Sequence, residues 1–162
     1  MAEIVNTNTV AGEQTTRADA VLSDAQVAEF HDQGYLVVDF GLNDDLLEQI
    51  KEKVYPCYPE EYQEDLSLPV RVQDIWQKVD EVRQLAVDSR ILTALEQLVG
   101  RKPLPFQTLN FPVGTSQPAH SDMIHFNSIP GGFMAGVRVA LEDMDEDNGP
   151  LIYYQGSHKL PE

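Results

Sequence analysis

The stretch Gly136-Val137-Arg138-Val139-Ala140-Leu141 decides the fold of this chain, because its alternation is that of a half-buried β-strand. Successive side chains of a strand point to opposite faces, so Val137, Val139 and Leu141 share one side. That side is apolar and is predicted to pack on helices. The other side carries only small residues besides Arg138, as the wall of a pocket would. We therefore predict a strand over 133–141, covered by helices on one face.

Helical signals dominate the chain before this strand. Ser23-Asp24-Ala25-Gln26 is a capping box that predicts a helix ending at Gly34, and a short apolar strand follows at 35–38. The same reasoning predicts a helix from Asn43 or Asp44 to Pro56, two short helical segments between 72 and 86, a helix from Asp88-Ser89 to Gly100, and a loop over 56–69. Residues 1–21 are polar and aperiodic, and we expect a disordered tail there.

Strands and turns dominate after Pro103. Apolar and alternating segments predict strands at 104–111, 120–126 and 150–154, in addition to the one at 133–141. Helices that precede a run of turn-linked strands indicate an α+β fold with helices packed on an antiparallel sheet. No linker divides residues 22–162, so we expect one domain.

Composition excludes several classes of function. The formal charge is −16 and only 11 residues are Lys or Arg, which argues against nucleic acid and anionic membrane surfaces as partners. The chain shows no signal peptide and no apolar run near the roughly 18 residues of a membrane span. A single cysteine, Cys57, excludes an internal disulfide. We expect a soluble, cytoplasmic protein that binds a small-molecule substrate; nothing in the sequence indicates an oligomeric state.

His120-Ser121-Asp122 is the candidate metal motif. On an extended strand, residues two apart point to the same face, so the imidazole and the carboxylate can converge on one metal ion. Two histidines and one carboxylate form the facial triad of non-haem Fe(II) oxygenases. His120 and Asp122 would supply two of these three ligands. The motif alone is more often a hydrogen-bonded His–Asp pair at a strand end.

Several motifs in a fixed order add to this triplet. They are Gln117 to Asp122, Gly136 to Asp143, Asn148-Gly149-Pro150-Leu151 and Gly156-Ser157-His158-Lys159, preceded by the helix and strand of Val27 to Val38. Together they resemble the phytanoyl-CoA dioxygenase family from about residue 22 to the end. The resemblance implies a double-stranded β-helix (jelly-roll, cupin-like) fold with N-terminal helices packed on the sheet. It also implies Fe(II), and 2-oxoglutarate as the cosubstrate that is decarboxylated to succinate while a substrate C–H bond is hydroxylated.

The resemblance assigns His120 and Asp122 as the first two iron ligands. Related halogenases have a small residue in place of the carboxylate, so Asp122 indicates a hydroxylase. His125 is expected beside the pocket, in a substrate-side or structural role. His158 belongs to the Gly-Ser-His turn, which the family uses as a structural corner, and is not expected to bind iron.

Arg138 stands where relatives commonly carry tryptophan. An inward-facing guanidinium must be paired, so we predict that it binds a carboxylate of 2-oxoglutarate or of an anionic substrate; an ion pair with a nearby acid is the alternative. Polar residues on the strand before the metal motif often hold 2-oxoglutarate in the family. Gln107, Thr108 and Asn110 are therefore further candidates for binding the cosubstrate.

The family's distal histidine ligand and its 2-oxoglutarate-anchoring arginine have no counterpart here, because no histidine follows His158 and no arginine follows Arg138. A jelly roll would also lack its last strands. Three explanations are open: a fragment of a longer enzyme, a natural truncation without activity, or completion by a partner chain. We expect this chain alone to be inactive. The rival functions are a non-catalytic jelly-roll binding or scaffold protein with a vestigial metal site, and a zinc hydrolase that uses His120, Asp122 and His125.

Overall fold

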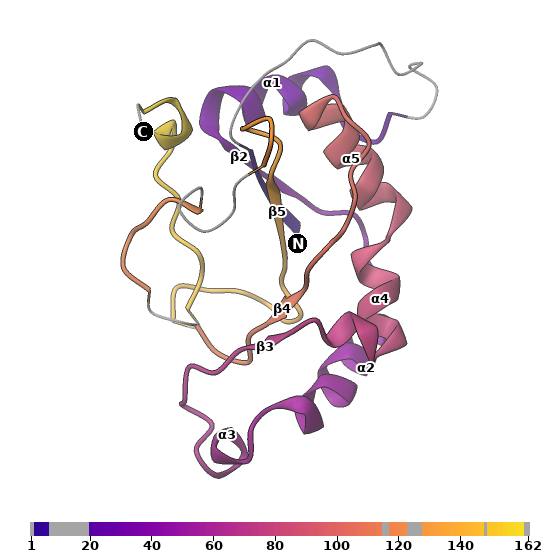
Figure 1. Ribbon diagram of the computed structural model, residues 1–162, viewed down its shortest axis with the longest axis vertical. Helices are drawn as coiled ribbons and strands as arrows, with labels where there is room; N and C mark the ends of the chain where they lie inside the picture. The colour runs from indigo at the N-terminus through magenta and orange to yellow at the C-terminus, as the bar shows by residue number, and fades with distance from the viewer. Residues whose placement is uncertain (1, 7–19, 115–116, 123–127, 148, 161–162) are drawn as a thin grey trace.

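The computed structural model describes residues 2–6, 20–114, 117–122, 128–147 and 149–160; for 2–6 it describes the backbone alone. Within these residues the chain combines helices with two small antiparallel sheets (Figure 1). The fold class is therefore mixed helix and strand, as predicted.

The larger sheet has three strands in the order β2-β1-β5. These are β1 (Ala2–Asn6), β2 (Tyr35–Val38) and β5 (Ala135–Val139). The central strand β1 is antiparallel to both neighbours, so β2 and β5 run parallel to each other with one strand between them. The predicted strands at 35–38 and 133–141 are both present, the second one shorter than expected.

Strand β1 lies where part of a disordered tail was expected, whereas residues 7–19 of that tail lie outside the described residues. Its residues pair with β2 from Ala2 to Val5 and with β5 from Ala2 to Asn6. Disorder was expected because the segment is polar and aperiodic. In the structure, however, the two neighbouring strands present unpaired backbone N–H and C=O groups to it on both sides. Backbone hydrogen bonds to both neighbours favour the strand whatever its local propensity.

Two helices cover one face of this sheet. Helix α1 (Asp24–Gln33) and helix α5 (Ser89–Val99) pack on it through a buried apolar cluster; in Figure 1 α1 lies across the upper ends of the strands and α5 lies to their right. The members of the cluster are Leu22, Phe30, Leu36, Val38, Ile91, Ala94, Leu95 and Leu98, with Ala135 and Val137 packed against them. The prediction that Val137 faces the helices is confirmed.

Both helices begin and end where their capping residues predict. The Ser23 side chain and Gln26 form the capping box of α1, and Gly34 ends the helix in the left-handed conformation with φ of 90°. Asp88 caps α5 by accepting hydrogen bonds from the backbone N–H of Arg90 and Ile91, at 2.9 and 3.4 Å. These local signals account for the accuracy of the helix predictions.

A second apolar cluster lies at the other end of the molecule. It joins α2 (Asp44–Val54), the short helix η3 (Ile75–Gln77) and α4 (Asp80–Ala86) through Ile50, Val54, Ile75, Val79 and Val82. Leu141 packs against this cluster from the far end of its predicted strand, as its apolar face requires. The segment 56–69, predicted as loop, contains η2 (Tyr55–Cys57) and α3 (Glu60–Glu64) at its start.

Few strands form after residue 100. The predicted strand at 104–111 is reduced to β4 (Leu109–Asn110), which pairs with β3 (Val72–Gln73). Of the strand predicted at 120–126, residues 120–122 are not a strand and the rest lies outside the described residues. Residues 150–154 are not a strand either, and the last described element is the short helix η5 (Ser157–Lys159). A strand needs a neighbour to accept its hydrogen bonds, and the described residues provide none there.

The sheets do not close into a barrel within the described residues, so the expected double-stranded β-helix is not formed there. Apolar side chains remain exposed in this half, notably Leu104 at 85%, Ile129 at 101% and Ile152 at 80%. None of the described helices is both long enough and apolar enough to cross a membrane.

Candidate metal and substrate site

His120 is held in one orientation by its own backbone. Its Nδ1 lies 2.7 Å from the carbonyl oxygen of Pro118, which can only accept a hydrogen bond, so Nδ1 carries a proton. With Nδ1 engaged there, the ring directs Nε2 outward, the arrangement that metal-binding histidines use.

Asp122 lies beside that nitrogen. The distance from His120 Nε2 to Asp122 Oδ1 is 3.4 Å, and the two side chains are 33% and 67% exposed. One ion with ligand distances of about 2.1 Å, as first-row divalent metals have with nitrogen and oxygen, spans such a separation. The residues therefore fit two adjacent positions of a metal site. They converge although 120–122 is not a strand, so the predicted reason for their convergence does not hold.

No group of three or more His, Cys, Asp or Glu side chains in the described part of the chain is arranged to hold a metal ion. His125, expected beside the pocket, lies outside the described residues. Among the described residues, the approach of His120 to Asp122 is what bears on a metal site, and no third ligand is identified there.

The candidates for binding 2-oxoglutarate have separate surroundings. Thr108 is engaged with the segment before η3: its N–H donates to Asp74 Oδ1 at 3.3 Å, and its Oγ1 accepts from the N–H of Trp76 at 3.5 Å. Asn110 pairs with Val72 across β4 and β3, and its Oδ1 is buried with no hydrogen-bond partner among the described residues. Gln107 is half-buried. Of the three, Asn110 retains an acceptor that a ligand could satisfy.

Arg138 lies on the sheet face that the helices leave uncovered. Val137 packs on the helical cluster, so its neighbours in β5, Gly136 and Arg138, point to the opposite side. Arg138 is half-buried, and its guanidinium makes no hydrogen bond or ion pair within the described part of the chain. The pairing register places Glu3 of β1 directly opposite it. Both predicted kinds of partner, a ligand carboxylate and a nearby acid, remain open.

His158 has a structural contact, as the family resemblance implied. Its Nε2 donates to the carbonyl oxygen of His31 in the last turn of α1, at 3.1 Å. Lys159 pairs with Asp32 at 2.7 Å, and the Gly156 N–H donates to the Gln33 carbonyl at 2.8 Å. The Lys159 ammonium holds the pKa of Asp32 below its ordinary value through this hydrogen bond and through its charge. The Gly-Ser-His turn is thereby attached to the end of α1.

Sequence reasoning missed an aromatic pair on the uncovered side of the sheet. The rings of Tyr35 and Tyr153 stack with centroids 4.9 Å apart and an interplanar angle of 11°. Tyr35 alternates with the buried Leu36 and so lies on the same face as Arg138. The alternation in β2 indicated the face of Tyr35, but no local pattern links it to Tyr153, more than 100 residues later.

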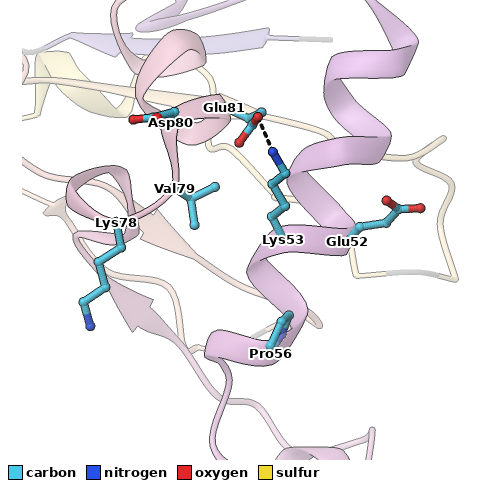
Figure 2. A pocket seen from close by; sticks show the side chains of 7 residues that line it. All are labelled: Glu52, Lys53, Pro56, Lys78, Val79, Asp80 and Glu81. Atoms are coloured by element: carbon cyan, nitrogen blue, oxygen red, sulfur yellow. Dashed lines mark hydrogen bonds and ion pairs between the residues drawn. The ribbon is translucent and has the colours of Figure 1, made fainter.

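A groove of about 470 Å³ lies between α2 and α4, away from all of these residues. Figure 2 shows the ion pair between Lys53 and Glu81 across it. This pair holds the pKa of Glu81 below its ordinary value, chiefly through the hydrogen bond from Lys53. None of the predicted site residues lines the groove, which is formed by Glu52, Lys53, Pro56, Lys78, Val79, Asp80 and Glu81.

Comparison with known protein families yields a match. The family model described as phytanoyl-CoA dioxygenase matches residues 30–162, which is well over half of the chain. Neither the curated proteins nor the solved structures contain a significant match.

Proposed function

Because the chain belongs to the phytanoyl-CoA dioxygenase family, whose members are generally oxygenases, we propose that it carries part of the active site of an Fe(II)/2-oxoglutarate-dependent hydroxylase that acts on a small molecule. The observation that carries this proposal is the 3.4 Å approach of His120 Nε2 and Asp122 Oδ1 in a segment that the family model covers. A His–Asp ion pair would show the same approach, so metal binding has to be measured directly.

His120 and Asp122 would hold the metal. The Pro118 carbonyl keeps the His120 ring turned so that Nε2 faces Asp122, which reduces the entropy lost when both bind one ion. Iron with 2-oxoglutarate supplies the oxidation of a C–H bond by molecular oxygen in this family. A carboxylate at residue 122 occupies a metal position that would otherwise admit a halide, and so favours hydroxylation over halogenation.

For the cosubstrate we propose the polar residues of the segment that includes β4. Asn110 is a candidate through its side-chain NH₂, which can donate to a carboxylate; its buried Oδ1, which has no partner in the described structure, can only accept and is not satisfied by 2-oxoglutarate. Gln107 and Thr108 would assist, Thr108 after giving up its contact with Trp76. The Arg138 guanidinium would take a carboxylate, either of 2-oxoglutarate or of the substrate.

A jelly roll remains our proposal for the fold of a complete domain. Strands β2 and β5 are parallel with one strand between them, the helices cover one face, and apolar side chains of residues 104–160 are exposed. Further strands on the uncovered side would bury them. We also propose a cytoplasmic location.

The metal proposal is tested by titrating the chain anaerobically with Fe(II), and with Co(II) as a spectroscopic substitute. We expect weak binding that is lost in His120→Ala and Asp122→Asn. Asp147→Asn, which removes the charge of an exposed aspartate elsewhere, is the matched control and should bind as the wild type does. Equal binding by all four proteins would refute the site.

The oxygenase proposal is tested by adding 2-oxoglutarate to the Fe(II) protein. A complete site gives a weak visible charge-transfer band and then releases succinate in oxygen. For this chain alone we expect little charge-transfer absorption and little succinate, because no third metal ligand is identified among the described residues. Sequencing the gene beyond Glu162 is the second test: a histidine and an arginine at family spacing would support the oxygenase.

A non-catalytic binding protein with a vestigial metal site is the alternative function. It is favoured by the absence of a third ligand among the described residues. It would be supported if a protein with all three family ligands formed no succinate with any small-molecule substrate.

A further inference from the structure

The uncovered side of the three-stranded sheet carries a set of residues that we call the open face: Tyr35 and Val37 of β2 with Gly136 and Arg138 of β5. The helices pack on the opposite side through Leu36, Val38 and Val137. In Figure 1 the C-terminal segment, drawn in yellow, runs on the side of the sheet away from α5. Tyr153 of this segment stacks on Tyr35 and so borders the open face.

The open face combines one cation with apolar surface. Arg138 is half-buried and has no hydrogen bond or ion pair within the described residues. A cation withdrawn partly from water without a partner is unfavourable, so this position favours an anion from outside the described contacts. Val37 is 41% exposed, and Glu3 of β1 pairs with both Val37 and Arg138. An apolar side chain and the cation therefore lie at opposite ends of one line of residues across the sheet.

Gly136 leaves room for such a ligand. A Cβ built on Gly136 would meet nothing within 4 Å, so space is open next to Arg138 on the same face. Gly136 lies in one cross-strand row with Tyr35, since Val5 of β1 pairs with both. Two strand spacings separate them, about 9.5 Å. A flat group that lies on the backbone at Gly136 and extends toward the Tyr35–Tyr153 stack crosses β1 between them.

We propose that the open face binds the substrate itself, an organic monocarboxylate with a flat apolar body about 9 Å long. The carboxylate pairs with the Arg138 guanidinium, which matches carboxylates in a two-bond geometry, and the body lies over Gly136 toward Tyr35. The formal charge of −16 favours a singly charged ligand over a phosphate dianion. That the ligand is a substrate rests on the proposed oxygenase function; that it binds here does not.

The test uses trans-cinnamate as the probe and its neutral amide, cinnamamide, as the matched control ligand, titrated by calorimetry into metal-free protein. We expect saturable binding of cinnamate that is at least tenfold tighter than that of cinnamamide. Arg138→Gln should remove this preference, and Arg138→Lys should keep part of it. Arg71→Gln, at an exposed arginine outside the open face, should bind as the wild type does.

Two further arms separate the competing partners of Arg138. If 2-oxoglutarate binds more tightly than cinnamate and depends equally on Arg138, the residue serves the cosubstrate and the proposal is wrong. Glu3→Gln removes the acid opposite Arg138 in the register, and we expect cinnamate binding that is unchanged or tighter. Lack of saturable binding in both the wild type and Glu3→Gln, or equal affinity for cinnamate in Arg138→Gln, would overturn the proposal.

The failures of the two proposals are distinguishable. Cinnamate binding is measured without metal, so a missing charge-transfer band or missing succinate refutes the oxygenase and leaves the carboxylate site standing. Conversely, loss of cinnamate binding leaves Fe(II) binding by His120 and Asp122 intact. Circular dichroism of each Arg138 variant checks that the fold is retained.

Discussion

Residues 20–100 and residues 101–160 of this chain differ in how their apolar side chains are used. In the first region the helices bury a continuous core, with Phe30 and Ile50 each only 1% exposed. In the second, Leu104, Ile129 and Ile152 are largely exposed. Helices satisfy their backbone hydrogen bonds internally, whereas strands need neighbours. The first region is therefore stable on local structure plus packing, and the second depends on contacts between distant segments.

The largest expected difference in the free energy of unfolding is between two variants, each of which shortens one apolar side chain, one in each region. Phe30→Ala should lower the free energy of unfolding by about 3–5 kcal/mol, because it removes a fully buried ring from the core of α1 and α5. Leu104→Ala should change it by less than about 0.5 kcal/mol, because that side chain is 85% exposed. Urea denaturation followed by circular dichroism measures both, and equal losses would abolish the distinction between the two regions.

Gly34→Ala tests the contact between the regions. Residue 34 has φ of 90°, and an added Cβ would lie 2.2 Å from His158 Nδ1. The left-handed conformation alone costs about 1–2 kcal/mol for alanine, and the clash should also release the turn at 157–159. We expect a loss of about 2 kcal/mol in unfolding free energy and faster proteolysis near residue 158.

Gly41→Ala is the control for backbone strain, since residue 41 also has positive φ, of 56°, but no atom within 4 Å of an added Cβ. It should destabilise the protein without exposing the C-terminal turn. Equal proteolysis near residue 158 in the two variants would show that the contact with His158 does not hold the turn.

Asp88→Ala acts within the first region. It removes the cap of α5 and the partner of Arg90, whose guanidinium donates to Asp88 and, at 2.7 Å, to the carbonyl oxygen of Phe40 after β2. Loss of the cap should cost about 1 kcal/mol at pH 7. The hydrogen bond from Arg90 holds the pKa of Asp88 below its ordinary value, with burial opposing it.

This lowered pKa sets the sign of the pH dependence. Asp88 stabilises the folded protein above its unfolded pKa of about 3.9, and the contribution is lost as pH falls through the lower folded pKa. The stability difference between wild type and Asp88→Ala should therefore be constant from pH 7 to pH 5 and shrink in strongly acidic solution. A difference that grows on acidification would contradict this assignment.

The smallest expected effect concerns Lys159→Met, which removes the ion pair with Asp32 between the C-terminal turn and α1. Both side chains are more than half exposed, at 53% and 76%, so water screens their attraction. We expect a slight fall in the melting temperature in dilute buffer and none in 1 M salt, where the Debye length is about 3 Å. A fall that persists in high salt would indicate that the lysine stem contributes by packing.

The accuracy of the sequence-based predictions follows the same division. Ser23, Asn43, Asp88 and Gly100 predicted the ends of their helices correctly, because each one acts on backbone groups within a few residues of itself. The strands predicted at 104–111 and 150–154 are reduced or absent, since alternation shows which face of a strand would be buried but not whether a partner exists. Strand β1 was not predicted because its partners β2 and β5 exist although its own local sequence gave no strand pattern.

The candidate site was predicted in part. The spacing of His120 and Asp122 predicted that they form a pair. In the structure they lie close together outside any strand, and a hydrogen bond to the Pro118 carbonyl orients the His120 ring. The alternation of β5 predicted the face of Arg138 correctly. Its lack of a partner within the described residues could not be predicted, because that depends on where the many acids of the chain lie in space.

By itself, the sequence determined the helices, the two faces of β5, the family and the pair of metal-ligand candidates. These depend on interactions within a few residues or on motifs in a fixed order. Only the tertiary structure decided that β1 lies between β2 and β5, that His158 occupies the space beside Gly34, and that Tyr153 stacks on Tyr35 next to Arg138. Each of these joins residues far apart in the chain, where the free energy comes from packing and backbone pairing that no local pattern encodes.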